Sequence, residues 1–224
     1  MKLIYLVIFL LVSCGNESRN PAGVPAEAKF DRKMNLYSHR SGEILKLWYE
    51  DGSLYSECKT TRFGLKNGEC RYYSGKGVLI AKGRFNQGER DGMWEWFFEN
   101  GRVFYRQEYA RGKRKSFWMT VVEWGNDHGR YERFYPDGRL EEKGSYDHGQ
   151  RHGKWLKYFP DGKTEYTGSY QAGKKTGDWV YYYPDGKIEI REKFDGSGGL
   201  IFRESFYPDG KTRCIHSAKK VTCR

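Results

Sequence analysis

The segment GDWVYYYPDGK at residues 177–187 decides the fold, because its turn recurs along the chain. The same turn reads YPDGRL from residue 135, FPDGKT from 159, YPDGKI from 183 and YPDGKT from 207, so its glycines are 24 residues apart. Stepping back by 24 from Gly125 gives Gly101 and Gly77. A fixed period of this length indicates a repeat architecture.

Further positions recur within one period, counted from the turn glycine. Glycine stands at +6, +11 and +15 and tryptophan at +17; after Gly162 these are Gly168, Gly173, Gly177 and Trp179. The match is complete in three units. The unit from Gly101 keeps Trp118 but not every glycine, and the unit from Gly125 lacks 11 residues. The last full unit is degenerate, as is expected near an end of a repeat array.

Short runs of alternating polar and apolar residues, broken by glycine, predict strands and hairpins. Proline fixes φ at the second residue of a turn, and glycine supplies a positive φ. Folding one unit about its centre places Gly168 opposite Trp179, Tyr166 opposite Tyr181 and Tyr170 opposite Gly177. Each indole then lies over a glycine that leaves room for it.

The recurring Gly-x-Trp, the tyrosine-rich strand and the Asp-Gly turn resemble MORN-repeat proteins, and in particular the MORN-variant repeats of bacterial lipoproteins and antitoxin-like proteins. The resemblance covers residues 42–213. It implies an all-β fold, in which hairpins of about 24 residues stack into an elongated, twisted antiparallel sheet with a shallow groove. It also implies a scaffolding, membrane-associated or antitoxin-like role.

The N-terminus has the pattern of an exported protein. Residues 1–13 contain one cation, ten apolar residues and Ser13, which predicts a signal peptide. The sequence LVSC that ends at Cys14 resembles a bacterial lipobox, which implies acylation of Cys14. We therefore expect a lipidated flexible tether at residues 14–36 and a repeat domain at 37–224, held at the cell envelope and preferably at the outer membrane.

Four cysteines remain after Cys14, an even number that fits an oxidising compartment. Cys58 stands at +6, where other units have glycine, and Cys70 stands where they have tryptophan. We therefore expect Cys58–Cys70 and Cys214–Cys223 disulfides, one capping each end of the sheet. A metal site of all four cysteines is the alternative, but neither pair has metal-ligand spacing.

No sequence motif indicates catalysis. The recurring Asp137, Asp161, Asp185 and Asp209 each occupy a turn position, and no nucleophile with a nearby base stands out. His128, His148 and His152 lie in glycine-rich hairpin loops, where we expect solvated side chains rather than a metal site. We expect no enzyme activity and no cofactor.

A stripe of aromatic residues is the strongest candidate for a binding surface. Trp94, Trp118, Trp155 and Trp179 recur on one face, where they form either a one-sided core or the lining of a groove. The chain has 40 Lys and Arg against 29 Asp and Glu, a net charge of +11. This charge solvates the sheet, or it attracts an acidic protein, an anionic glycan or lipid headgroups. Nucleic acid does not fit an exported lipoprotein.

From these features we expect a monomeric, membrane-anchored envelope lipoprotein that serves as a non-catalytic binding or scaffolding module. The alternative is an antitoxin or immunity-type protein that neutralises a protein toxin.

Overall fold

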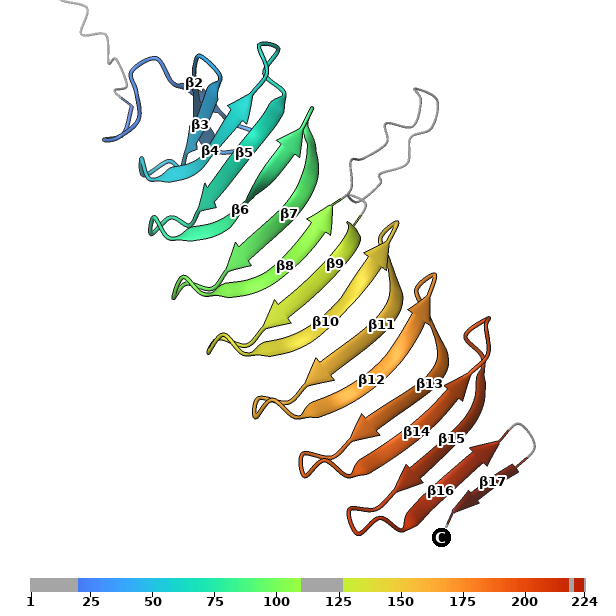
Figure 1. Ribbon diagram of the computed structural model, residues 1–224. Helices are drawn as coiled ribbons and strands as arrows, with labels where there is room; N and C mark the ends of the chain where they lie inside the picture. The colour runs from blue at the N-terminus through green and yellow to red at the C-terminus, as the bar shows by residue number, and fades with distance from the viewer. Residues whose placement is uncertain (1–19, 110–126, 218–219, 224) are drawn as a thin grey trace, which may run out of the picture.

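The computed structural model describes residues 20–109, 127–217 and 220–223, which form one antiparallel sheet of 17 strands. Each strand is hydrogen-bonded to the strands before and after it in the sequence, so the sheet is a meander (Figure 1). The described ranges contain no helix, and hence none able to cross a membrane. The predicted all-β sheet of stacked hairpins is confirmed.

The strands are β1 (Lys29–Asp31), β2 (Leu36–Ser41), β3 (Ile44–Trp48), β4 (Leu54–Thr60), β5 (Lys66–Tyr73), β6 (Leu79–Asn86), β7 (Glu89–Phe97), β8 (Val103–Tyr109), β9 (Asp127–Phe134), β10 (Leu140–Asp147), β11 (Gln150–Tyr158), β12 (Thr164–Gln171), β13 (Lys174–Tyr182), β14 (Ile188–Phe194), β15 (Leu200–Phe206), β16 (Thr212–Ser217) and β17 (Lys220–Cys223).

The Pro-Asp-Gly segments form the turns along one edge of the sheet. In the turn between β13 and β14, the Gly186 amide donates to the Tyr183 carbonyl at 2.8 Å, and Gly186 has a φ of +89°. The Asp185 carboxylate accepts the Lys187 amide at 3.0 Å. The Lys187 ammonium then reaches the Pro208 carbonyl of the next turn at 2.7 Å, so successive units are tied together at this edge.

Two-residue turns close the β2–β3, β6–β7, β10–β11 and β12–β13 hairpins along the other edge. Between β12 and β13, Ala172 and Gly173 have φ values of +48° and +77°. Positive φ at both central residues defines the type I′ turn, which matches the twist of the flanking strands. The glycine at +11 therefore supplies a conformation that the tight hairpin needs.

The glycine at +15 shifts the strand register. Tyr166 pairs with Tyr181 as predicted, but Tyr170 pairs with Lys175 and not with Gly177. Gly177 has a φ of +64° and lies at the β-bulge between these two pairs. A bulge places extra residues on one strand. The sequence-based register assumed equal numbers of residues on both strands and is therefore wrong beyond the bulge.

The core is a row of tryptophans packed on glycines, as predicted. Trp94, Trp155 and Trp179 are 1%, 0% and 1% exposed. A Cβ on Gly168 would lie closer than 3.0 Å to the indole of Trp179, so only glycine fits there. The indole N–H of Trp179 donates to the Ser169 carbonyl at 3.0 Å, which satisfies its one polar group.

The N-terminal boundary of the fold differs from the predicted one. Residues 14–19 lie outside the described part, but residues 20–36 of the expected tether pack on the sheet. β1 pairs with β2, and buried Val24 and Ala28 contact Trp48. This segment lacks the repeat period, yet it adds β1 to the sheet and covers the apolar residues at this end.

The predicted division of the middle units is wrong. β8 pairs directly with β9, and Gln107 faces Tyr131. The turn glycines Gly101 and Gly138 therefore belong to one unit, which is 37 residues long in place of 24. Trp118 lies outside the described residues. Tyr131 lies opposite Gln107, which stands at +6 of this unit, where other units have a tryptophan opposite.

Both predicted disulfides are present. Cys58 faces Cys70 across β4 and β5, in place of a glycine and a tryptophan. Cys214 and Cys223 join β16 to β17 at the C-terminal edge. The first disulfide does not cap the N-terminal end, because β1, β2 and β3 precede it.

Candidate binding face

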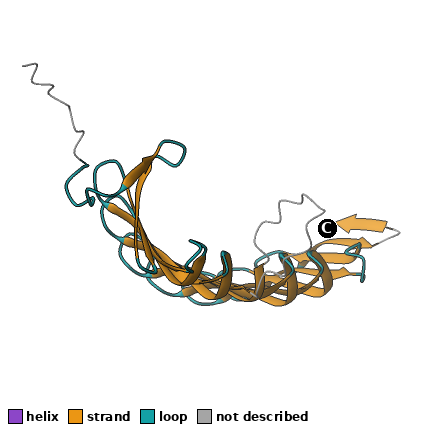
Figure 2. Cartoon of the chain, turned by 90° about the horizontal axis from the view of Figure 1, so that it is seen from above, coloured by secondary structure: helices purple, strands orange, loops and turns teal. Residues whose placement is uncertain are grey.

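The sheet has one aromatic face and one charged face, because alternate residues of a strand point to opposite sides. On the aromatic face, ring contacts with centroid separations of 4.2 to 6.3 Å run across the strands from β5 to β13. The row comprises Tyr72, Trp94, Trp96, Tyr105, Tyr131, Trp155, Tyr170 and Trp179. Figure 2 shows that the sheet is arched, most strongly at its N-terminal end.

The predicted tryptophan stripe is core and not a contact surface. Trp94, Trp155 and Trp179 are almost completely buried, so a ligand cannot stack on them without rearrangement. Their burial comes from glycines on one side and from cationic side chains on the other. Any binding on this face therefore uses the residues that cover the tryptophans.

A cation four residues before each of Trp94, Trp155 and Trp179 covers its ring. The guanidinium of Arg151 lies 4.0 Å from the Trp155 ring centroid, that of Arg90 lies 4.9 Å from Trp94, and the ammonium of Lys175 lies 4.7 Å from Trp179. Cations within about 6 Å of a ring face are attracted by its quadrupole. Sequence reasoning missed these residues, although the recurring spacing of cation and tryptophan was a usable signal.

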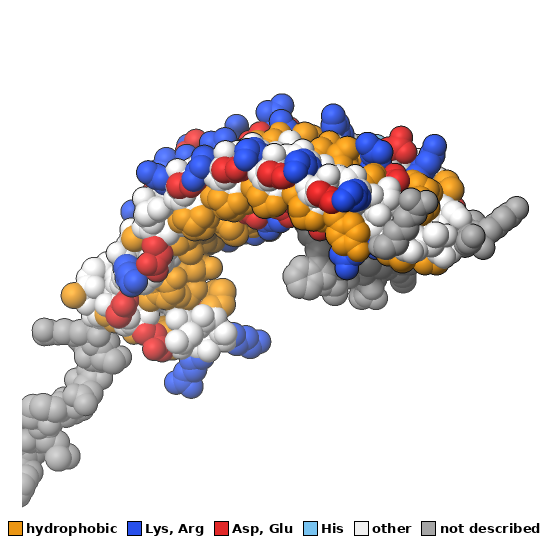
Figure 3. Space-filling view, turned by 90° about the horizontal axis from the view of Figure 1, so that it is seen from below, with side chains coloured by type: hydrophobic (Ala, Val, Ile, Leu, Met, Phe, Trp, Pro, Cys, Tyr) orange, Lys and Arg blue, Asp and Glu red, His pale blue; other side chains and the backbone are white. Residues whose placement is uncertain are grey.

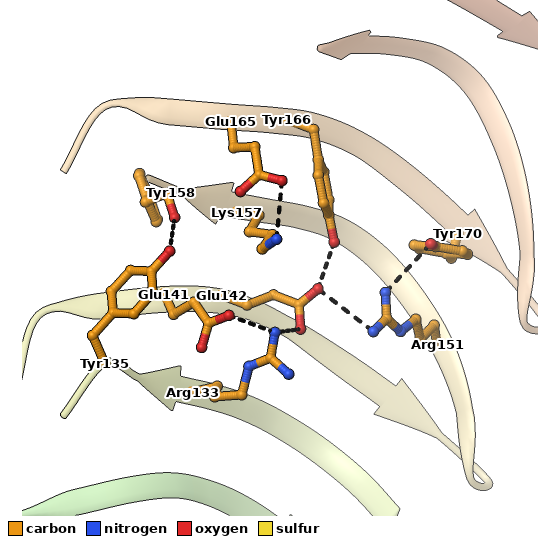
Figure 4. A network of polar contacts seen from close by, with 10 residues as sticks. All are labelled: Arg133, Tyr135, Glu141, Glu142, Arg151, Lys157, Tyr158, Glu165, Tyr166 and Tyr170. Atoms are coloured by element: carbon orange, nitrogen blue, oxygen red, sulfur yellow. Dashed lines mark hydrogen bonds and ion pairs between the residues drawn. The ribbon is translucent and has the colours of Figure 1, made fainter. Parts of the chain in front are cut away.

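In the C-terminal half, buried carboxylates neutralise these cations (Figure 4). Glu142 is 3% exposed, accepts the Tyr166 hydroxyl at 2.5 Å and lies 3.5 Å from the guanidinium of Arg151. Burial, together with the hydrogen bond to Glu142, raises the pKa of Tyr166. Burial opposes the charge on Arg151, but Glu142 and Tyr170 hold its pKa above the usual value.

The next unit repeats this compensation with different residues. Lys175 lies 3.2 Å from the Glu192 carboxylate and 2.5 Å from the Tyr181 hydroxyl. Burial lowers the pKa of Lys175, but Tyr181 and Glu192 outweigh it and raise the net value. This part of the aromatic face is a closed polar network.

In the N-terminal half the corresponding cations donate hydrogen bonds to hydroxyls and not to carboxylates. Lys66 donates to the Tyr72 hydroxyl at 2.8 Å, and Arg90 donates to the Tyr109 hydroxyl at 3.0 Å. Within the described ranges, no carboxylate oxygen lies within the ion-pair distance of 4.0 Å from Lys66 or Arg90. Within the described part of the chain, both cations therefore lack an anionic partner.

These two cations line a cavity of about 690 Å³ where the arch is tightest. Its aromatic-face lining includes Met34, Leu36, Leu47, Tyr55, Lys66, Tyr72, Arg90, Trp96 and Tyr105. Figure 3 shows hydrophobic side chains gathered in the hollow of the arch. Ligand sites are commonly concave and apolar with a few polar groups, and this cavity has that character.

The opposite face carries cross-strand ion pairs. Glu95 contacts Lys82 at 3.0 Å and Arg106 at 2.8 Å, and Arg106 lies 3.6 Å from Glu132. Burial opposes ionisation of Glu95, but hydrogen bonds from Lys82 and Arg106 lower its pKa. Much of the charge on this face is thus internally paired.

The recurring turn aspartates serve the backbone, as expected. Asp137, Asp161, Asp185 and Asp209 each accept the amide two residues later at 2.9 to 3.0 Å. Hydrogen bonds from these residues lower the pKa of each carboxylate. With the neighbouring Arg and Lys they form the row of alternating charges along one edge in Figure 3.

Two of the loop histidines lie side by side. His128 and His152 occupy equivalent positions, but the structure brings His128 beside His148, with ring centroids 5.9 Å apart. At the C-terminus, His216 lies near Cys214 and Cys223, whose sulfurs are joined in a disulfide.

Comparisons with curated proteins and with solved structures carry no argument about this chain. No protein of curated function matches the sequence. The crystal structure of TarM is 14% identical, with 71% of this chain and 20% of TarM covered, and has a TM-score of 0.18. A mutant of S. aureus TarM in complex with fondaparinux, α-GlcNAc-glycerol and UDP is 11% identical, with 80% and 21% covered and the same TM-score. The chain spans about a fifth of TarM, and these likenesses carry no argument.

Four hairpins match one repeat family. Residues 90–111, 127–148, 151–172 and 175–195 match the family model described as MORN repeat variant. Each match begins on a strand that carries the ring opposite position +6, passes the Asp-Gly or Asn-Gly turn, and continues through the next strand. Three of the matches begin at the cation, whereas Asp127 stands at that position in the match from residue 127. These four hairpins are similar to MORN repeat variants.

Proposed function

We propose that this chain is a membrane-anchored envelope lipoprotein that acts as a non-catalytic binding module through the N-terminal part of its aromatic face. The cavity with two uncompensated cations, Lys66 and Arg90, is the observation that carries the proposal. Its lining fits an apolar segment that also bears an anionic group. The turn carboxylates support a non-catalytic role, because each of them is engaged by its own turn.

A photocrosslinking experiment tests the cavity. The benzophenone amino acid p-benzoyl-phenylalanine replaces Met34, which lines the cavity and is 53% exposed. The matched control places it at Met93, which is 39% exposed and lies on the charged face with Glu95. Crosslinking in the native cells should yield one adduct from position 34 that position 93 does not form. Identical adducts from both positions, or none, would contradict the proposed binding face.

The crosslinked product also separates the two functional alternatives. An acidic protein that is not toxic when expressed alone supports a scaffold or binding module. A protein that is toxic alone and is neutralised by this chain supports the antitoxin alternative.

The lipid anchor has its own test. Cys14→Ala removes the sulfur that would carry the acyl chain, so the variant should move from the membrane fraction to the soluble fraction. A single acyl chain binds membranes only marginally, whereas several chains anchor a protein stably. Unchanged membrane association of the variant would exclude anchoring through Cys14 while leaving the cavity proposal intact.

A further inference from the structure

Two imidazoles and a carboxylate meet where the β10–β11 turn lies beside the start of β9. The Asp147 Oδ1 atom lies 3.2 Å from Nδ1 of His128 and 2.6 Å from Nδ1 of His148. One ligand atom from each residue lies within 4.8 Å of the others. All three side chains reach solvent, with exposed fractions of 47%, 45% and 81% for His128, Asp147 and His148.

The backbone holds the three residues in place. Tyr146 pairs with Gly129 between β10 and β9, so the next residues along, Asp147 and His128, lie side by side across the strands. His148 is the first central residue of the two-residue turn and has a φ of +49°. Because the turn type is dictated by the hairpin, the direction of the His148 side chain is set by the fold.

The fold itself does not require this ligand set. The equivalent turn between β6 and β7 has Asn86 and Gln87, and the turn between β12 and β13 has Gln171 and Ala172. Ala172 has a φ of +48°, almost identical to that of His148, so the turn forms equally well without a histidine. His152 lies opposite Gln171 and has no carboxylate across the strand.

The donor set suits a borderline transition metal ion. Imidazole nitrogen with one carboxylate oxygen is the donor chemistry of zinc, copper and nickel sites. Tetrahedral zinc with bonds of about 2.1 Å places its ligand atoms about 3.4 Å apart. Exposed side chains on a fixed backbone reach that spacing by small rotations from the present one.

We propose that His128, Asp147 and His148 form a three-ligand site for a divalent transition metal ion, with Zn²⁺ or Cu²⁺ as the favoured occupants. The ion would lie between the Asp147 Oδ1 atom and the two imidazoles. Three protein ligands leave at least one position for water or for a ligand atom from a partner. This proposal does not depend on the cavity at the N-terminal end.

The test is titration of the full-length chain with ZnCl₂ by isothermal titration calorimetry, and with CuSO₄ by electron paramagnetic resonance. One equivalent of Zn²⁺ should bind, and the Cu²⁺ spectrum should show hyperfine coupling to two imidazole nitrogens. His128→Ala, His148→Ala and Asp147→Asn should each weaken binding at least about 10-fold, since even loss of an outer-shell partner costs 10- to 100-fold. All three side chains are exposed, so we expect the variants to fold normally. Circular dichroism checks this.

His152→Ala is the matched control and should leave binding unchanged. A positive control transfers the site: Gln171→Asp with Ala172→His places the same three residue types around His152, and a second equivalent should then bind. No saturable binding up to about 1 mM Zn²⁺ would overturn the proposal. Binding that is insensitive to His128→Ala, or no second equivalent in the transfer variant, would overturn it as well.

Discussion

Replacing Gly168 by alanine should damage the core of one repeat. The added Cβ would lie closer than 3.0 Å to several ring atoms of Trp179, whereas ordinary van der Waals contact begins near 3.4 Å. The indole is 1% exposed and has no free volume to enter, so it has to leave its position over the strand. Overpacking of this kind costs about 1–3 kcal/mol. Loss of the hydrogen bond to the Ser169 carbonyl adds about 1 kcal/mol.

We therefore expect Gly168→Ala to lower the free energy of unfolding by about 2–4 kcal/mol, measured by urea denaturation with tryptophan fluorescence. The control is Gly196→Ala, because a Cβ at Gly196 meets no atom within 4 Å. That variant should stay within about 0.5 kcal/mol of the wild type.

A double-mutant cycle identifies the cause of the loss. In a Trp179→Leu background the alanine at position 168 meets a smaller side chain, so its additional cost should fall below about 1 kcal/mol. A Gly168→Ala variant as stable as the control would refute the packing argument. A cost that persists unchanged without the indole would show that backbone conformation, and not Trp179, demands the glycine.

Three further predictions concern covalent and polar interactions. Replacing Cys58 and Cys70 by serine should lower the free energy of unfolding by about 3 kcal/mol. Denaturation with and without reductant measures this loss, and the reductant should have no added effect at this site in the serine variant. Glu142→Gln should destabilise the sheet by about 2 kcal/mol and should lower the pKa of Tyr166, which tyrosine absorbance against pH measures; an unchanged pKa would exclude the hydrogen bond as a cause. Burial raises the pKa of Tyr131 to about 12 from a model-compound value of 10.0, so the folded state retains this proton where the unfolded state has lost it. Its contribution to stability should be complete below pH 10 and disappear between about pH 10 and 12, and Tyr131→Phe should remove that part of the alkaline decline.

Sequence reasoning succeeded where the relevant contacts are local. The spacing of Gly168 and Trp179 predicted their packing, and the repeat register predicted the Cys58–Cys70 disulfide. It failed at Tyr170, because a bulge at Gly177 changes the strand register without changing the repeat length. It also divided the middle units wrongly, because counting glycines does not show that β8 and β9 pair directly.

The candidate sites were less accessible to sequence reasoning than the fold. The tryptophans were identified, but their burial depends on how Arg90, Arg151 and Lys175 fold back over them. Arg90 and Arg151 occupy equivalent positions but differ in their partners. A carboxylate lies near Arg151, whereas none of the described carboxylates lies near Arg90. Such differences between equivalent positions become meaningful only when the side chains are placed in space.

The sequence by itself determined the period, the hairpins and both disulfides, because each of these involves residues close together in the chain and follows from local conformation. Only the tertiary structure decided which face is hollow, where the cavity lies, and that His128 meets His148 and not His152. The physical reason is that the arch accumulates from the twist of many strands, and the histidine contact depends on the register between hairpins. Neither quantity is contained in a single repeat.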